Sequence, residues 1–248
     1  MIDVLRFTIP VFMVGALGVA VGSRGVSADT RRARWIKFLV YVLIVHTVLG
    51  AAWSGAPVVV GLFVVIAAAA GVEMWRVRRA GAFDTGRWLL PAGVFVLCAC
   101  GTVRFVDVAG PGLITFTYLV VAAFDGFSQV GGQILGRHRL AGVVSPGKTV
   151  EGAVGGLLAA VAIAWFLRAF SGMAAPLALV FAVVCAAAGL AGDLGASWVK
   201  RRAGIKDFGH VLPGHGGVLD RFDSFLAAAT IAWIWHLMAG PSGFLFAS

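Results

Sequence analysis

Long apolar segments recur along the whole chain and alternate with short polar segments. Each apolar segment reaches or approaches the ~20 residues that a helix needs to cross ~30 Å of hydrocarbon. These segments cover residues 5–22, 36–53, 57–72, 89–106, 111–134, 152–170, 174–198 and 222–246. Proline and glycine near or within the third and fourth segments make these two the weakest candidates. The pattern predicts an all-α fold, a polytopic integral membrane helical bundle of about eight transmembrane helices.

The composition agrees with a membrane protein and indicates its orientation. The chain is 60% hydrophobic and 12% charged, compared with about 45–50% and about 25% in globular chains. Cytoplasmic loops of membrane proteins are enriched in Lys and Arg. If the N-terminus is outside, only Arg6, Arg104 and Arg168 of the 20 Lys and Arg residues lie outside. We therefore predict that both termini are outside, and we attribute the net charge of +9 to topology and anionic lipids rather than nucleic acid.

The chain divides into two regions by the kind of polar residue that its loops contain. Residues 1–110 hold the N-terminal transmembrane helices with basic cytoplasmic loops, and residues 111–248 mix acids, bases, histidines and glycines between their apolar segments. The basic segment RRARWIKF, residues 31–38, is interpreted as lying at the lipid surface. The three cysteines lie inside predicted spans, where we interpret them as small apolar residues.

Asp193 lies near the end of an apolar segment, where a charged group costs at least ~2.5–3.5 kcal/mol unless it is paired or faces water. Ser197, Lys200 and Arg201 follow at positions i+4, i+7 and i+8, so these side chains share one helix face. A carboxylate, a hydroxyl and two cations in a row suit a metal ion and phosphate oxygens. A salt bridge between Asp193 and Lys200 at the helix end is the alternative.

Asp220 and Asp223 lie three residues apart at the start of the last apolar segment. Two acids on one helix face suit Mg²⁺, which takes oxygen ligands and shares its coordination sphere with substrate phosphates. Capping of the helix N-terminus is the alternative for Asp220. The preceding loop is rich in glycines, which allow a backbone to wrap a polyphosphate with its N–H groups. It also contains His210 and His215, but a zinc site would need further ligands nearby.

A second polar cluster begins at Asp125, and Gln129 and Gln133 continue it at intervals of four residues along an otherwise apolar segment. A polar stripe within a span is expected to face the protein interior, and hydrogen bonding between helices is the alternative to a functional site. The segment SPGKTVEG follows, but no strand precedes it as a phosphate-binding Walker loop requires.

Two segments together resemble the phosphatidate cytidylyltransferases, also called CDP-diacylglycerol synthases. The first is SWVKRRAGIKDFGHVLPGHGGVLDRFD, residues 197–223, and the second is SPGKTVEGAVGG, residues 145–156. Asp193 falls in the sequence GDLGAS, where this family has its own GDL element. The resemblance covers residues 120–225 and implies that residues 111–248 form a transmembrane catalytic region.

The resemblance implies that a phosphate oxygen of phosphatidate attacks the α-phosphorus of CTP, which gives CDP-diacylglycerol and releases pyrophosphate. It implies that Asp193 and Asp220 bind Mg²⁺ with Asp223 as a further ligand, and it leaves a second metal or a monovalent cation open. Lys200 joins these acids as a catalytic residue. The resemblance assigns the phosphates to Ser197, Lys200, Arg201, Lys206, Arg221 and Lys148. No residue is assigned as a general base, since a phosphate dianion needs little help from one.

The remaining assignments concern the nucleotide and the lipid. The resemblance implies that His215, Gly216 and Gly217 close the loop over the nucleotide. It further implies that Asp207 orients Lys206 or contacts the base or ribose, and that the helix of Asp125 lines the lipid acceptor. The helix sequence FDGFSQVGGQILG, residues 124–136, follows the family only loosely. In the segment 145–156, Gly147 replaces the first of the two lysines that are usual in the family.

These departures leave the acceptor open, so another lipid phosphate is the alternative to phosphatidate. A transporter or lipid-binding membrane protein is the rival class. We expect the chain in a bacterial inner membrane with its site at the cytoplasmic face, and CTP and membrane lipids as partners. The small residues of segment 153–165 suit either a homodimer or packing within the bundle.

Overall fold

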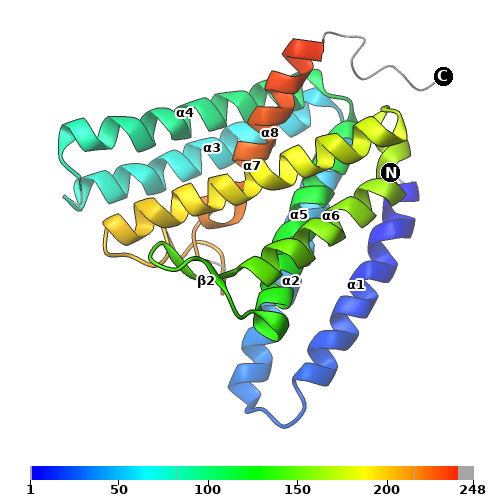
Figure 1. Ribbon diagram of the computed structural model, residues 1–248, viewed down its shortest axis with the longest axis horizontal. Helices are drawn as coiled ribbons and strands as arrows, with labels where there is room; N and C mark the ends of the chain where they lie inside the picture. Colours follow the sequence, from blue (N-terminus) through cyan, green and yellow to red (C-terminus); the bar gives the residue numbers. More distant parts are fainter. Residues whose placement is uncertain (1, 82, 215, 240–248) are drawn as a thin grey trace.

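The computed structural model describes residues 2–81, 83–214 and 216–239, and these residues form an almost entirely helical protein (Figure 1). One short antiparallel hairpin interrupts the helices between α5 and α6. The elements are α1 (Ile2–Gly22), α2 (Ala28–Trp53), α3 (Ala56–Arg79), α4 (Thr85–Val108), α5 (Pro111–Leu135), β1 (Arg139–Ala141), β2 (Ser145–Thr149), α6 (Val150–Ser171), α7 (Ala175–Arg202) and α8 (Leu219–Ala239). Within the described residues, each predicted apolar segment therefore coincides with a helix, and the all-α prediction is confirmed.

Six of the described helices, α2 to α7, are long and apolar enough to cross a membrane. The two weakest predicted segments, in α3 and α4, are both uninterrupted helices of 24 residues. Pro57 lies in the first turn of α3, where a backbone N–H would have no helical partner and its loss costs little. The span count of eight and the outside location of both termini stay predictions.

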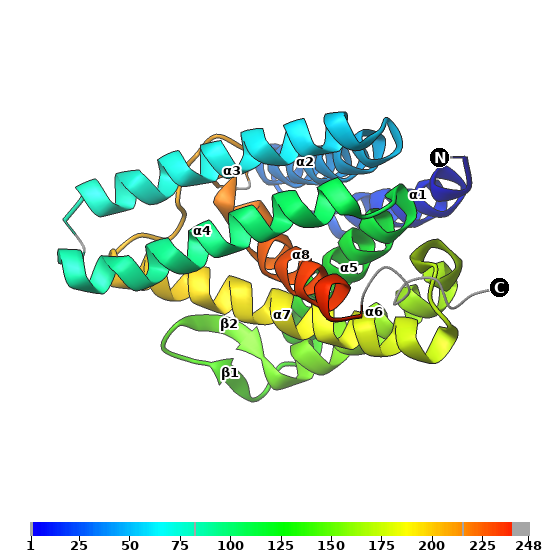
Figure 2. The same ribbon diagram turned by 90° about the horizontal axis from the view of Figure 1, so that it is seen from above.

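Helix α8 lies at the centre of the bundle and contacts α3, α4, α5 and α7 (Figure 2). Its contact with α4 depends on Gly101, because a Cβ atom there would lie only 2.4 Å from the hydroxyl oxygen of Thr230. That hydroxyl donates to the backbone oxygen of Cys98 at 3.0 Å. Helix α8, which carries the predicted site residues Asp220 and Asp223 near its start, is thereby attached to α4.

Helices α5 and α6 pack with their backbones in close contact. A Cβ atom at Gly156 would lie 2.0 Å from Ser128 Oγ, and one at Gly152 would lie 2.5 Å from the backbone oxygen of the same serine. These glycines of α6 are therefore used for packing within the bundle. These contacts within one chain do not test the predicted homodimer, which stays a prediction.

The hairpin was not predicted from the sequence. β1 and β2 pair Arg139 with Thr149 and Ala141 with Ser145, and the hairpin projects beside α7 in Figure 2. Thr149 caps α6 by accepting a hydrogen bond from the N–H of Gly152 at 3.1 Å. Glu151 accepts hydrogen bonds from the backbone N–H groups that precede the hairpin, at 3.0 and 3.2 Å. Both ends of the hairpin are thus fixed to α6.

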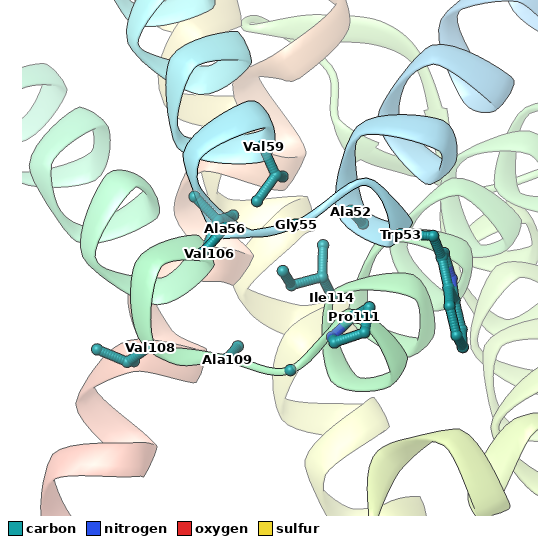
Figure 3. A pocket seen from close by; sticks show the side chains of 11 residues that line it. Ala52, Trp53, Gly55, Ala56, Val59, Val106, Val108, Ala109, Pro111 and Ile114 are labelled. Atoms are coloured by element: carbon teal, nitrogen blue, oxygen red, sulfur yellow. The ribbon is translucent and has the colours of Figure 1, made fainter.

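An apolar pocket of about 320 Å³ lies between the α2–α3 and α4–α5 connections (Figure 3). Its wall includes Trp53, Val59, Val106 and Ile114, and none of its lining residues is charged. Trp53 is fixed there by a hydrogen bond from its indole N–H to the hydroxyl oxygen of Thr115 at 3.0 Å. This pocket therefore contrasts with the opposite end of the bundle, where the predicted site residues lie.

Candidate active site

Lys200 and Asp220 form a buried ion pair that joins α7 to α8. Lys200 Nζ donates to Asp220 Oδ1 at 2.8 Å, and the Asp220 side chain is only 1% exposed. The other carboxylate oxygen accepts from the backbone N–H groups of Phe208 and Gly217 at 2.8 and 2.9 Å. Lys200 therefore pairs with Asp220 and not with Asp193, and Asp220 binds both the middle and the end of the loop that leads into α8.

Glu73, near the end of α3, is a second buried carboxylate at this loop. Its two oxygens accept from the backbone N–H groups of Val218 and Leu219 at 2.9 and 2.8 Å, and only 2% of the residue is exposed. A carboxylate at this position satisfies N–H groups that have no partner at the start of a helix, and it also complements the helix dipole. Glu73 was not among the predicted site residues, although a lone acid at the end of an apolar segment was a usable signal.

The two carboxylates explain why the loop needs glycines. A Cβ atom at Gly217 would lie 2.4 Å from a Glu73 oxygen, and one at Gly216 would lie 2.9 Å from an Asp220 oxygen. Gly216 also has φ of +82°, which a residue with a side chain rarely adopts. The N–H of Gly217 is bonded to Asp220, so this predicted substrate-binding residue contributes to the site by holding the loop in place.

The loop forms one wall of a polar pocket of about 320 Å³. Four predicted substrate-binding residues meet there with four residues that were not predicted for it. The predicted residues are Lys206, Asp207, Gly216 and Arg221, and the others are Lys37, His210, Leu212 and Gly214. The pocket thus combines three permanent cations with a single carboxylate. Lys37 was missed because a basic segment beside a span is typically a lipid-surface segment.

A group of acids from three helices lies beside this pocket. Asp193 of α7 forms an ion pair with Lys148 of β2, and Ser197 donates to Asp193 at 3.4 Å. Asp125 of α5 interacts electrostatically with Asp193. Asp223 of α8 interacts with both of these acids. We call Asp125, Asp193 and Asp223 the acid cluster.

Arg221 connects the acid cluster to the pocket, because it lines the pocket and also interacts electrostatically with Asp125. Helix geometry explains the position of this arginine, since consecutive residues of α8 point in different directions. A phosphate group in the pocket and one beside the acid cluster would therefore share its guanidinium.

The acid cluster offers a place for a divalent cation. Within the described parts of the chain, no three His, Cys, Asp or Glu side chains form a ready-made metal site. Mg²⁺ does not require one, because it usually binds one or two carboxylates together with substrate phosphates and water. Asp193 and Asp223 fit this chemistry, since their mutual repulsion would be relieved by a cation. Asp220 fits it less well, because both its oxygens already accept hydrogen bonds.

Four residues singled out from the sequence lie outside these contacts or outside the described residues. Arg201 is exposed, donates to the backbone oxygen of Ile205 at 3.4 Å and does not line the pocket. Gln129 and Gln133 are exposed, so the expectation that the whole polar stripe faces the interior holds only for Asp125, which is half-buried. His215 lies outside the described residues.

Comparison with known proteins covers the same region. The sequence model of the Cytidylyltransferase family matches residues 106–239. A phosphatidate cytidylyltransferase of Brucella abortus is 37% identical over 202 residues, which cover 78% of this chain and 70% of the relative. The enzyme of the same name from Staphylococcus saprophyticus is 44% identical over 115 residues, which cover 46% of this chain and 44% of the relative. That of Staphylococcus epidermidis is 40% identical over 130 residues, which cover 51% of this chain and 50% of the relative.

The chain thus spans about half the length of the staphylococcal relatives that it matches. The family match contains the acid cluster, Lys148, Lys200 and the whole loop before α8, whereas Lys37 and Glu73 lie before it. The match extends over more than half of the chain, and the Brucella relative extends the similarity to most of it. The chain belongs to the cytidylyltransferase family.

Proposed function

We propose that this chain is a membrane-embedded nucleotidyltransferase that condenses CTP with phosphatidate to give CDP-diacylglycerol and pyrophosphate. The observation that supports this most directly is that Arg221 both lines the cationic pocket and interacts electrostatically with Asp125 of the acid cluster. A reaction between two phosphate-bearing substrates requires two adjacent phosphate sites. The names of the relatives support the choice of phosphatidate as acceptor.

In the proposed reaction, an oxygen of the lipid phosphate forms a bond to the α-phosphorus of CTP. The bond from that phosphorus to the bridging oxygen of the β-phosphate breaks, and its electron pair leaves with pyrophosphate. Lys206 and Arg221 hold the leaving phosphates in the pocket. Lys148 and Arg221 hold the attacking phosphate beside the acid cluster. Catalysis then depends mainly on positioning and on neutralising charge.

We propose Mg²⁺ as the cofactor, held by Asp193 and Asp223. When bound, Mg²⁺ neutralises the phosphate oxygens and makes the α-phosphorus more electrophilic. Asp193 is now paired with Lys148, so entry of the lipid phosphate would let this lysine move to a phosphate oxygen. Lys200 and Asp220 act as positioning residues in this proposal, because their buried pair holds the loop that forms the pocket.

The rival class, a transporter, has less support. A transport path requires polar groups along several spans and on both sides of the membrane. The charged side chains described above gather at one end of the bundle, while the pocket at the other end is lined by uncharged residues. We further propose that the charged end lies at the cytoplasmic face of a bacterial inner membrane, where CTP is available.

A second acceptor remains a specific alternative, because Gln129 and Gln133 are exposed on the helix that carries Asp125. Exposed amides near a lipid phosphate would suit a headgroup with additional hydrogen-bonding groups. In this alternative, the nucleotide chemistry is unchanged and the acceptor is another lipid phosphate.

The test is release of pyrophosphate by the detergent-purified protein with phosphatidate and Mg²⁺, given CTP, dCTP, ATP, GTP and UTP in turn. We expect release only with cytidine nucleotides, only with lipid, and not in EDTA. Release with a different lipid phosphate alone would select the second acceptor. No release across a panel of lipid phosphates would contradict the proposed function.

A further inference from the structure

We infer that Lys37 of α2 belongs to the binding site for the two terminal phosphates of the nucleotide, which leave together as pyrophosphate. This inference rests on the proposed function and adds a residue from the N-terminal region to its site. Lys37 lies outside both the segment that matches the family and the segments that carry the resemblance. Its position beside the loop before α8 is visible only in the fold.

The stem of Lys37 is held against the loop. A Cβ atom at Gly214 would lie 2.9 Å from Lys37 Cγ and 3.3 Å from its Cε, so the side chain runs directly over this glycine. Gly214 has φ of +73°, a conformation that glycine adopts without strain. The N–H of Leu212 donates to the backbone oxygen of Gly216 at 2.9 Å, which closes the turn around Gly214. The turn therefore keeps the lysine stem along the pocket wall.

The charges of the pocket suit a polyphosphate. Lys37, Lys206 and Arg221 line it together with one acid, Asp207, and with His210. A compact anion with several negative charges is the ligand that such a wall favours, because each cation can donate to a different oxygen. A lysine stem that served only as a lipid anchor would extend toward headgroups. Lys37 instead lines a cavity formed by the loop before α8.

The position of the pocket indicates which phosphates of the nucleotide would bind in it. Arg221 lines the pocket and also interacts electrostatically with Asp125. The pocket therefore adjoins the acid cluster and Lys148, where bond formation at the α-phosphorus is proposed. Phosphates that follow the α-phosphate would enter the pocket. Lys37 is then a contact of the leaving group rather than of the lipid phosphate.

The first experiment measures binding of inorganic pyrophosphate with Mg²⁺ to the detergent-purified full chain by titration calorimetry. Lys37→Met removes the charge but keeps the stem, and Lys37→Arg keeps the charge. The matched control is Arg32→Met, because Arg32 is an exposed cation of the same helix that does not line the pocket. We expect Lys37→Met to weaken pyrophosphate binding about tenfold, as for loss of one charge-assisted contact. Lys37→Arg and Arg32→Met should bind within about twofold of the unsubstituted protein.

Equal binding by Lys37→Met and the unsubstituted protein would overturn the inference, and so would absence of pyrophosphate binding by the unsubstituted protein. An equal loss in Lys37→Met and Arg32→Met would also overturn it, because it would indicate a general effect of surface charge. The proposed function is tested separately, since calorimetry needs no turnover. Specific pyrophosphate binding without cytidylyl transfer to any lipid would support the Lys37 site and contradict the enzyme.

Discussion

The carboxylates at the charged end of the bundle differ in what their oxygens contact. Glu73 and Asp220 accept hydrogen bonds from backbone N–H groups, and Asp220 also pairs with Lys200. Asp193 and Asp223 lie close enough to repel each other. Buried carboxylates that are fully hydrogen-bonded stabilise a loop, whereas carboxylates that repel each other are suited to bind a cation.

Asp193→Asn is expected to reduce pyrophosphate release by at least about a hundredfold, because it removes a charge that organises the reacting phosphates. The measurement is the initial rate at saturating CTP and lipid. The control is Asp107→Asn, since Asp107 pairs with Arg104 at the opposite end of the bundle and is 45% exposed. Full activity of Asp193→Asn would contradict its assignment to the metal.

Glu73→Gln is expected to raise the KM for CTP more than the KM for the lipid. Glu73 now accepts one hydrogen bond at each carboxylate oxygen. A glutamine has only one side-chain oxygen, so its NH₂ group would face one of the two backbone N–H groups, and two donors cannot form a hydrogen bond. The loop would then be held at fewer points, with a loss of about 1–3 kcal/mol in the free energy of unfolding. Steady-state kinetics and thermal unfolding in detergent measure the two effects. A loss of stability with both KM values unchanged would assign Glu73 a purely structural role.

Single residues of the site could be predicted only where they lie in one segment. Asp193, Lys200 and Asp220 are close in sequence, and the resemblance identified them together. The contacts between segments could not be predicted. Lys200 pairs with Asp220 across a loop, and Glu73 binds two residues that lie 145 and 146 positions later in the chain. Such contacts depend on how helices pack, which hydropathy does not determine.

At the scale of elements, the close contact of α5 and α6 sets the position of two site residues. Asp125 lies on α5, and Lys148 lies on the strand that leads directly into α6. The glycines at this contact allow the backbones to approach, so a change in their spacing would move the two charged side chains relative to each other.

Gly156→Ala is therefore expected to destabilise the protein by about 1–3 kcal/mol, the usual cost of overpacking. The added Cβ atom would lie 2.0 Å from Ser128 Oγ and 2.5 Å from the backbone oxygen of Phe124. Gly155→Ala is the matched control, because its nearest contact would be 3.8 Å away. Thermal unfolding in detergent compares the two. Equal stability of both variants would mean that α5 and α6 are not packed as described.

The helices followed from the sequence, while the hairpin did not. Apolar segments long enough to cross a membrane have few alternatives to a helix, because lipid cannot satisfy backbone groups. The strands β1 and β2 are short and polar, and SPGKT includes a proline and a glycine that weaken any strand pattern. Their pairing is stabilised by contacts with α6 rather than by their own sequence.

At the scale of the whole molecule, the site combines residues in or next to all four predicted inside loops, which follow the first, third, fifth and seventh apolar segments. Lys37 is the last cation of the first loop, Glu73 precedes the second, Lys148 lies in the third, and the loop before α8 is the fourth. Their meeting at one end agrees with the predicted alternation. The prediction that this end faces the cytoplasmic side of the membrane stays a prediction.

Cysteine labelling tests this direction. The test uses a protein in which Cys98, Cys100 and Cys185 are replaced by alanine. We expect Val143→Cys to react with a membrane-impermeant maleimide only after the membrane has been permeabilised, so that the reagent reaches the inner face. Val143 lies at the hairpin turn and is 93% exposed. Asp107→Cys, at the other end of the bundle, should react in intact cells. Labelling of both positions from the same side would contradict the alternation.

The hydrogen bonds of Glu73 also determine when the site can form during synthesis. Its partners, Val218 and Leu219, are made 145 and 146 residues later. A growing chain therefore carries this carboxylate at the end of α3 without its final partners until α8 has begun to emerge from the ribosome. Only then can the helix dipole and two backbone N–H groups stabilise the charge. The cationic pocket is thus among the last parts of the protein to assemble, after most of the bundle is already in the membrane.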